Sequence, residues 1–110
     1  MVNAVLEPAT TDRYDLQARY LELTRELLPA RAARDGDLPI RFDHCFMRIV
    51  LDQLFGGCWY DHLSRKTPAY RQLDADQLRF AIDAAERFLG GDDETLRRWN
   101  ADSLRWRGKD

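Results

Sequence analysis

The sequence predicts an all-α protein, a compact bundle of about four helices with short connections. Apolar residues recur at helical spacing in four separate stretches of the 110-residue chain. Helix-capping residues or glycine and proline flank these stretches. No stretch of useful length alternates apolar and polar residues as a half-buried strand does. We therefore expect a single helical domain over residues 12–110, preceded by a flexible N-terminal arm over residues 1–11.

The first expected helix covers about residues 12–28. Asp12 and the two threonines before it are candidate N-caps. The apolar stripe that follows at helical spacing consists of Leu16, Tyr20, Leu23 and Leu27. Pro29 should disturb the helix, because proline has no N–H and its ring clashes with the preceding turn. Any continuation to Ala33 would therefore follow an irregularity.

The second expected helix begins near Pro39, which suits the first turn of a helix, after a turn around Gly36. It ends at about Phe55, because the adjacent glycines Gly56 and Gly57 are a strong C-terminal signal. Residues 59–65 are expected to form a short helical turn, which the proline at position 68 ends.

Two further helices complete the predicted bundle. Asp74 followed by Gln77 is a capping-box pattern, and the amphipathic stripe after it ends at Gly90 and its neighbouring glycine. Asp92 or Asp93 then caps a last helix that ends in basic residues, which complement the helix dipole.

Composition excludes several classes of protein. The net charge is −2, which argues against broad nucleic-acid binding. No apolar run approaches the length needed to span a bilayer, and residues 1–11 do not have the pattern of a signal peptide. Two cysteines make no disulfide framework, so we expect a reduced, cytoplasmic protein. No glycine-rich phosphate-binding loop is present, and no cofactor is expected.

The central helix carries its ionisable residues in two places. At about 100° per residue, Arg41, His44, Arg48 and Asp52 form one narrow polar stripe. The stripe could be solvated, with Arg48 and Asp52 as an i,i+4 ion pair. It could instead line a pocket, where His44 exchanges a proton, Arg48 clamps an anion and Asp52 orients the guanidinium. Asp43 lies on the apolar side, where a first-turn capping role explains it.

Metal or thiol chemistry would draw on four residues, His44, Cys45, Cys58 and His62. Together they could form a zinc site, but His44 and Cys45 point about 100° apart on a regular helix. Their spacing matches no standard zinc pattern, and no metal is expected. Cys58 and His62 could form a nucleophilic pair, although no activating cluster surrounds the thiol.

The C-terminal stretch combines basic residues with Trp99 and Trp106. This combination can bind nucleic acid, but two tryptophans seven residues apart are also core anchors on one helix face, and the acidic chain favours that interpretation. Asn100 and Ser103 flank this face and would need hydrogen-bond partners if buried. The end of the chain, including Arg107, could fold back over the central helix and add positive charge to the same cleft.

Three segments together resemble a group of small bacterial proteins that sometimes carry an acetyltransferase label. They are residues 41–49, 68–71 and 100–109, and the resemblance covers roughly residues 38–109. The acetyltransferase superfamily has a mixed α/β fold with a glycine-containing loop for the cofactor, and this sequence offers neither. The resemblance therefore implies no catalytic residue. It implies that the residues of interest are Asp43, His44, Arg48, Tyr70, Trp106 and Arg107.

The first functional hypothesis is a small helical binding module. It would hold an anionic small molecule or an acidic partner segment, with the candidate ligand-binding residues Arg41, His44, Arg48, Tyr70, Trp106 and Arg107. A second hypothesis is an enzyme, with acyl transfer suggested by the label alone, in which His44 is the general acid–base and Asp43 or Asp52 orients it. A third is a structural or interaction protein that forms a homodimer through the first helix.

Overall fold

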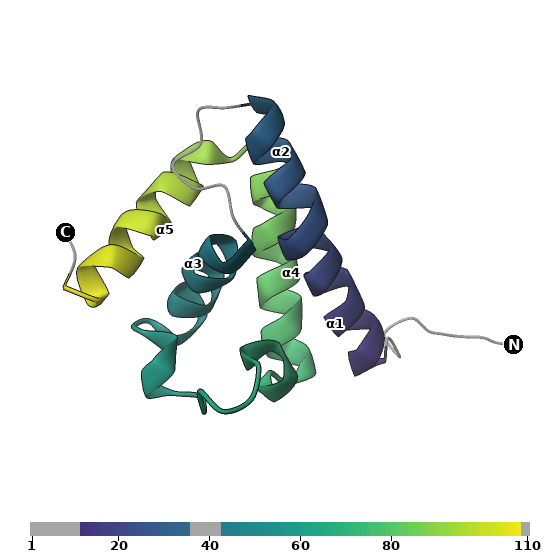
Figure 1. Cartoon of the computed structure of the whole chain (residues 1–110), viewed down its shortest axis with the longest axis vertical. Coiled ribbons are helices and arrows are strands. Elements are labelled where there is room, and N and C mark those ends of the chain that lie inside the picture. Colours follow the sequence, from purple (N-terminus) through teal and green to yellow (C-terminus); the bar gives the residue numbers. More distant parts are fainter. Residues whose placement is uncertain (1–11, 36–42, 109–110) are drawn as a thin grey trace, which may run out of the picture.

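The computed structural model describes residues 12–35 and 43–108, and within these ranges every regular element is helical (Figure 1). The elements are α1 (Arg13–Glu22), the π-helical segment η3 (Leu23–Leu27), α2 (Leu28–Asp35), α3 (Asp43–Phe55), the 3₁₀ turns η4 (Trp59–Asp61) and η5 (Ala69–Gln72), α4 (Ala75–Leu89) and α5 (Asp93–Trp106). The predicted all-α bundle is confirmed. The expected arm over residues 1–11, the turn at Gly36 and the helix start at Pro39 lie outside the described residues.

The segments α1, η3 and α2 follow one another without a break and form one long helix, capped by the Asp12 carboxylate. The irregularity expected near Pro29 is the π segment, in which the Leu28 N–H bonds the Leu23 carbonyl. Proline cannot donate to the carbonyl four residues before it, and its ring clashes there. A wider turn just before Pro29 relieves that clash, so the helix continues to Asp35.

The other helix ends follow the predicted capping chemistry. After α3, the Gly57 N–H donates to the Asp52 carbonyl at 3.0 Å and the Gly56 N–H donates to the Gln53 carbonyl at 3.3 Å, which is the pattern of a Schellman motif. Asp74 and Gln77 form the capping box of α4. Asp92 caps α5. The short turn expected over residues 59–65 is shorter in the structure, where only η4 is helical.

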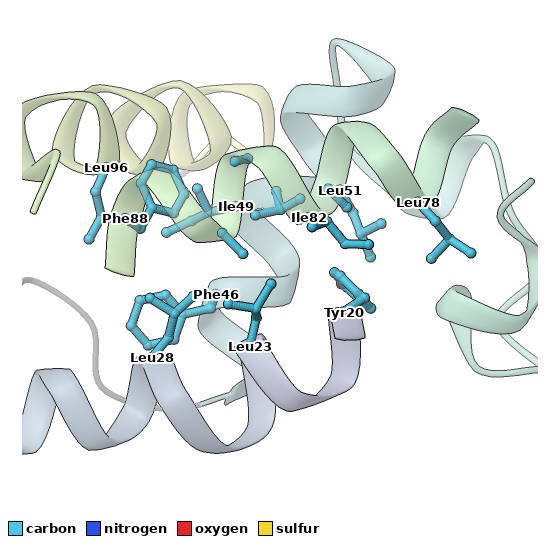
Figure 2. Packing of buried hydrophobic residues seen from close by; sticks show 14 of the residues in the cluster. Tyr20, Leu23, Leu28, Phe46, Ile49, Leu51, Leu78, Ile82, Phe88 and Leu96 are labelled. Atoms are coloured by element: carbon cyan, nitrogen blue, oxygen red, sulfur yellow. The ribbon is translucent and has the colours of Figure 1, made fainter. Parts of the chain in front are cut away.

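The core lies where the long N-terminal helix, α3 and α4 meet. α1 packs along α4, the π segment touches both α3 and α4, and α3 packs against α4 and α5. Figure 2 shows Tyr20, Leu23 and Leu28 pointing from the long helix into this core. The largest apolar side chains that are fully buried there are Tyr20, Leu23, Leu28, Phe46, Ile49, Leu73, Leu78, Phe88 and Leu96. Burial of such side chains contributes roughly 1.5–3 kcal/mol each.

No helix over the described ranges combines the length and the apolar character needed to cross a bilayer.

Gly56 offers a test of how α3 ends. Its φ is +70°, in the left-handed region, and a Cβ added there would meet nothing within 4 Å. Gly56→Ala should therefore lower the free energy of unfolding by about 1 kcal/mol through backbone strain alone. Gly57→Ala is the matched control, because the φ of Gly57 is not positive and a Cβ added there would also meet nothing within 4 Å. Urea denaturation checks both, and equal losses would contradict the proposed helix end.

Candidate binding pocket

The carboxylate of Asp52 is the most deeply buried charged group of the site. Its residue is 0% exposed, and its two oxygens accept four hydrogen bonds. Ser103 Oγ donates at 2.6 Å, and Arg107 donates from Nε at 2.8 Å and from Nη2 at 3.0 Å. The backbone N–H of Trp59 donates the fourth at 2.9 Å. Asp52 thus joins α3 to the end of α5 and to the start of η4.

Arg48 lies one helical turn before Asp52 and joins the same network. Its Nη1 donates to Ser103 Oγ at 2.6 Å and its Nη2 donates to Asn100 Oδ1 at 2.9 Å. Ser103 Oγ therefore accepts from Arg48 and donates to Asp52. Asn100 and Ser103 flank the face of α5 that carries the tryptophans, where buried polar groups need hydrogen-bond partners. The bonds from Arg48 supply these partners.

The predicted ion pair between Arg48 and Asp52 is wrong. Asp52 instead pairs with Arg107, whose side chain is 14% exposed. The physical reason is geometric, because the end of α5 brings two N–H donors of one guanidinium to both carboxylate oxygens. The solvated interpretation of the stripe is wrong for Asp52, which is fully buried. The expectation that Arg107 adds positive charge beside the central helix is confirmed.

The network carries an excess of positive charge. It contains two guanidinium groups and one carboxylate, and the hydrogen bond with Asp52 raises the pKa of Arg107 above its ordinary value. Among the described side chains, which do not include those of Asp43 and His44, Arg48 has no carboxylate partner, and its hydrogen-bond acceptors are the neutral groups of Ser103 and Asn100. Arg48 is thus held in place while its charge is left without a counterion there.

A pocket of about 340 Å³ lies beside this network. Its lining comes from α3, from the region where α1 passes into the π segment, from the turns η4 and η5, and from the end of α5. Its lining residues are Tyr20, Arg25, Met47, Arg48, Leu51, Trp59, Tyr60, Pro68, Ala69, Tyr70 and Arg107. Most of these side chains are apolar or aromatic, and three are arginines.

Two of the lining tyrosines each have two arginines against their rings. The guanidinium carbons of Arg65 and Arg107 lie 4.1 and 4.9 Å from the centre of the Tyr60 ring. A second tyrosine, Tyr70, has Arg25 at 5.3 Å and Arg71 at 6.0 Å. Such contacts are favourable because the ring face carries negative charge density.

The two neighbouring arginines also change the pKa of the Tyr70 hydroxyl. The neighbouring guanidinium of Arg25 is the largest influence and lowers the pKa of this phenol, and Arg71 acts in the same direction. This part of the lining is therefore positive.

The wall formed by residues 64–72 contains the short 3₁₀ turn η5 and is held in place by side-chain hydrogen bonds. Arg13 of α1 donates to the carbonyls of Tyr70 and Leu73 at 2.8 and 2.7 Å. The amide group of Gln72 bonds the backbone N–H and carbonyl of Ser64 and the carbonyl of Thr67. These bonds place Tyr70, which lies in the short 3₁₀ turn η5, at the pocket.

The pocket contains part of the predicted set of ligand-binding residues. Arg48, Tyr70 and Arg107 line it, whereas Trp106 is half-buried and is not among the lining residues. Arg41 lies outside the described residues, and so do the side chains of Asp43 and His44. The predicted roles of those three residues are therefore still predictions. Asp52 lies behind the wall and orients Arg107 rather than Arg48.

Among the aromatic and charged lining residues, sequence reasoning missed Tyr20, Arg25, Trp59 and Tyr60. Tyr20 was expected only as part of an apolar stripe. The pair Trp59 and Tyr60 lies in an irregular stretch with no periodicity to interpret. Arg25 lies in the π segment just before Pro29, and π turns are frequent at functional sites. The helix disturbance predicted at Pro29 was therefore the signal that could have pointed to Arg25.

Of the four candidates for metal or thiol chemistry, Cys45, Cys58 and His62 have described side chains. In the described part of the chain, no three His, Cys, Asp or Glu side chains are grouped so that they could hold a metal ion. Cys45 packs against the core, Cys58 precedes η4, and the His62 ring stacks on Phe55 with centroids 4.9 Å apart. Trp99 packs edge-on against Phe88, as a core anchor does.

Comparison of the chain with known protein families, with curated proteins and with solved structures yields no match.

The Asp52 network predicts a large and specific loss of stability. Asp52→Asn removes the charge that faces Arg107 and turns one acceptor into a donor, so it should lower the free energy of unfolding by about 3 kcal/mol. Asp76→Asn is the control, because its ion pair with Arg79 is on the surface and its side chain is 94% exposed. That change should cost less than about 0.5 kcal/mol. Chemical denaturation of both variants measures the difference, and similar small losses would refute the network.

Proposed function

We propose that this protein is a small helical binding protein whose pocket beside α3 holds an organic carboxylate with an apolar body. The observation that carries the proposal is the state of Arg48. This arginine lines a pocket of about 340 Å³, is held by Ser103 and Asn100, and has no carboxylate partner among the described residues.

An arginine that is held in place by neutral hydrogen-bond acceptors, as Arg48 is, is suited to binding an anion. A guanidinium bonded to a carboxylate of its own chain would have to give up that partner, whereas Arg48 keeps its charge available. Because two hydrogen bonds already hold the side chain, little conformational entropy remains to be lost on binding. Arg107 and Arg25 line the same pocket and add to the attraction.

The rest of the lining favours an organic anion over an inorganic one. Met47, Leu51 and Ala69 offer apolar surface that a bare phosphate or sulfate would leave uncovered. A volume of about 340 Å³ lies near the small end of the range for small-molecule sites, roughly 300–1,000 Å³. A compact carboxylic acid of that size meets both conditions.

The other hypotheses have less support. General acid–base catalysis depends on His44, whose side chain lies outside the described residues. The pocket's concave shape favours a small molecule over an acidic partner segment.

Two free cysteines suit a reducing compartment, so the cytoplasm is the proposed location.

Titration of the ¹⁵N-labelled full chain with sodium benzoate tests the proposal by NMR. Benzoate should cause saturable shifts at the amides of Met47, Leu51 and Tyr70, and benzyl alcohol should cause much smaller ones. Arg48→Gln should weaken benzoate binding by about tenfold or more, because a charge-assisted hydrogen bond is lost. Arg98→Gln is the charge-matched control, since Arg98 is exposed on α5 and away from the pocket lining.

Two outcomes would contradict the proposal. One is a set of benzoate shifts that is scattered over the surface or does not saturate. The other is equal affinity for benzoate in the wild type and in Arg48→Gln, with both proteins folded by circular dichroism.

A further inference from the structure

The hydroxyl of Tyr20 is a buried polar group for which the fold supplies no partner. Tyr20 lies on α1, is 1% exposed and lines the pocket beside α3. Its Oη is buried and has no hydrogen-bond partner among the described residues. Buried hydroxyls are nearly always hydrogen-bonded, so each exception in a folded protein calls for an explanation.

Packing alone does not explain this hydroxyl. Phenylalanine would fill the same core position without leaving a polar atom unpaired. The nearest hydroxyl on the same helix, that of Thr24, donates to the backbone carbonyl of Tyr20 rather than to the phenol. Burial raises the pKa of the Tyr20 phenol above its ordinary value, so the group stays neutral and can both donate and accept.

We propose that the ligand is a hydroxylated aromatic carboxylate, whose carboxylate binds Arg48 and whose hydroxyl reaches Tyr20 Oη by displacing the side chains that cover it. This inference rests on the proposed function and names the ligand class for the same pocket. The rings of Trp59, Tyr60 and Tyr70 in the lining favour a planar aromatic body. Because Tyr20 belongs to α1 and Arg48 to α3, one such ligand would contact two helices at once.

The unpaired hydroxyl gives the pocket a basis for discrimination. A ligand without the second polar group leaves Tyr20 Oη buried and unpaired, whereas a ligand with it completes a hydrogen bond that water does not weaken. Sites built in this way reject an analogue that lacks the matching group more strongly than apolar pockets distinguish sizes. Tyr20 is thus a specificity-determining residue in this proposal.

Matched ligand pairs test the proposal by isothermal titration calorimetry. The hydroxylated probes are 4-hydroxybenzoate, 4-hydroxyphenylacetate and 3-(4-hydroxyphenyl)propanoate, which differ in length. Their parents are benzoate, phenylacetate and 3-phenylpropanoate. At one length or more, the wild type should bind the hydroxylated member at least about fivefold tighter than its parent. Tyr20→Phe should abolish that preference, so that it binds both members of each pair with equal affinity.

A control on the same helix separates the pocket from a general effect. Tyr14→Phe removes a hydroxyl from a side chain that is 73% exposed and should leave every affinity unchanged. Tyr20→Phe should unfold at a temperature no lower than the wild type, because it removes an unpaired buried group. Should Tyr20→Phe fail to fold, the wild type labelled with ¹³C at tyrosine Cζ replaces it. The Tyr20 signal should then move with the hydroxylated acids and not with their parents.

The outcomes separate this inference from the function on which it rests. Equal affinity for both members of every pair, or a preference that survives in Tyr20→Phe, overturns the role of Tyr20 while carboxylate binding stands. Absence of binding by all six acids overturns the proposed function for aromatic carboxylates, and the ligand class falls with it.

Discussion

The buried carboxylate of Asp52 is the constraint on which the site depends. An uncompensated charge in a protein interior costs several kcal/mol, so the surrounding chain has to supply donors to it. The donors come from three places: Ser103 inside α5, Arg107 at its end, and the Trp59 N–H at the start of η4. The backbone carbonyl of Asp52 also closes the turn that ends α3. One residue therefore sets the end of α3, the direction of the next segment and the docking of α5.

Local charge and overall charge differ in this protein. The whole chain carries a formal net charge of −2, yet the pocket is lined by Arg25, Arg48 and Arg107 and backed by the buried carboxylate of Asp52. Neutralisation of Arg107 by Asp52 leaves Arg48 as the less compensated of the two cations, because Ser103 and Asn100 are neutral. Composition averages over the surface, and only the fold shows where like charges gather.

The sequence predicted what depends on neighbours along the chain and missed what depends on distant contacts. Helix ends at Asp74 and Gly56 were predicted because caps lie next to the residues they serve. The projection of α3 placed Arg48 and Asp52 on one face, but the partner that Asp52 takes arrives from α5, 55 residues later. The irregular stretch between α3 and α4 supplies much of the pocket wall and has no periodicity. Nor does a tyrosine in an apolar stripe reveal whether its hydroxyl is paired.

The π segment has a consequence for how this chain tolerates changes in length. One row of buried positions on the long helix advances by four residues, at Tyr20, Thr24, Leu28 and Ala32, and Leu23 and Arg31 are buried beside it. A regular α-helix turns by about 100° per residue, so a spacing of four drifts around the helix axis, and one wider turn corrects the drift. Loss of one residue within Leu23–Leu27 would convert that turn to ordinary α-helix and leave the faces before and after it in register. Relatives of this protein that lack one residue there could thus keep the same core.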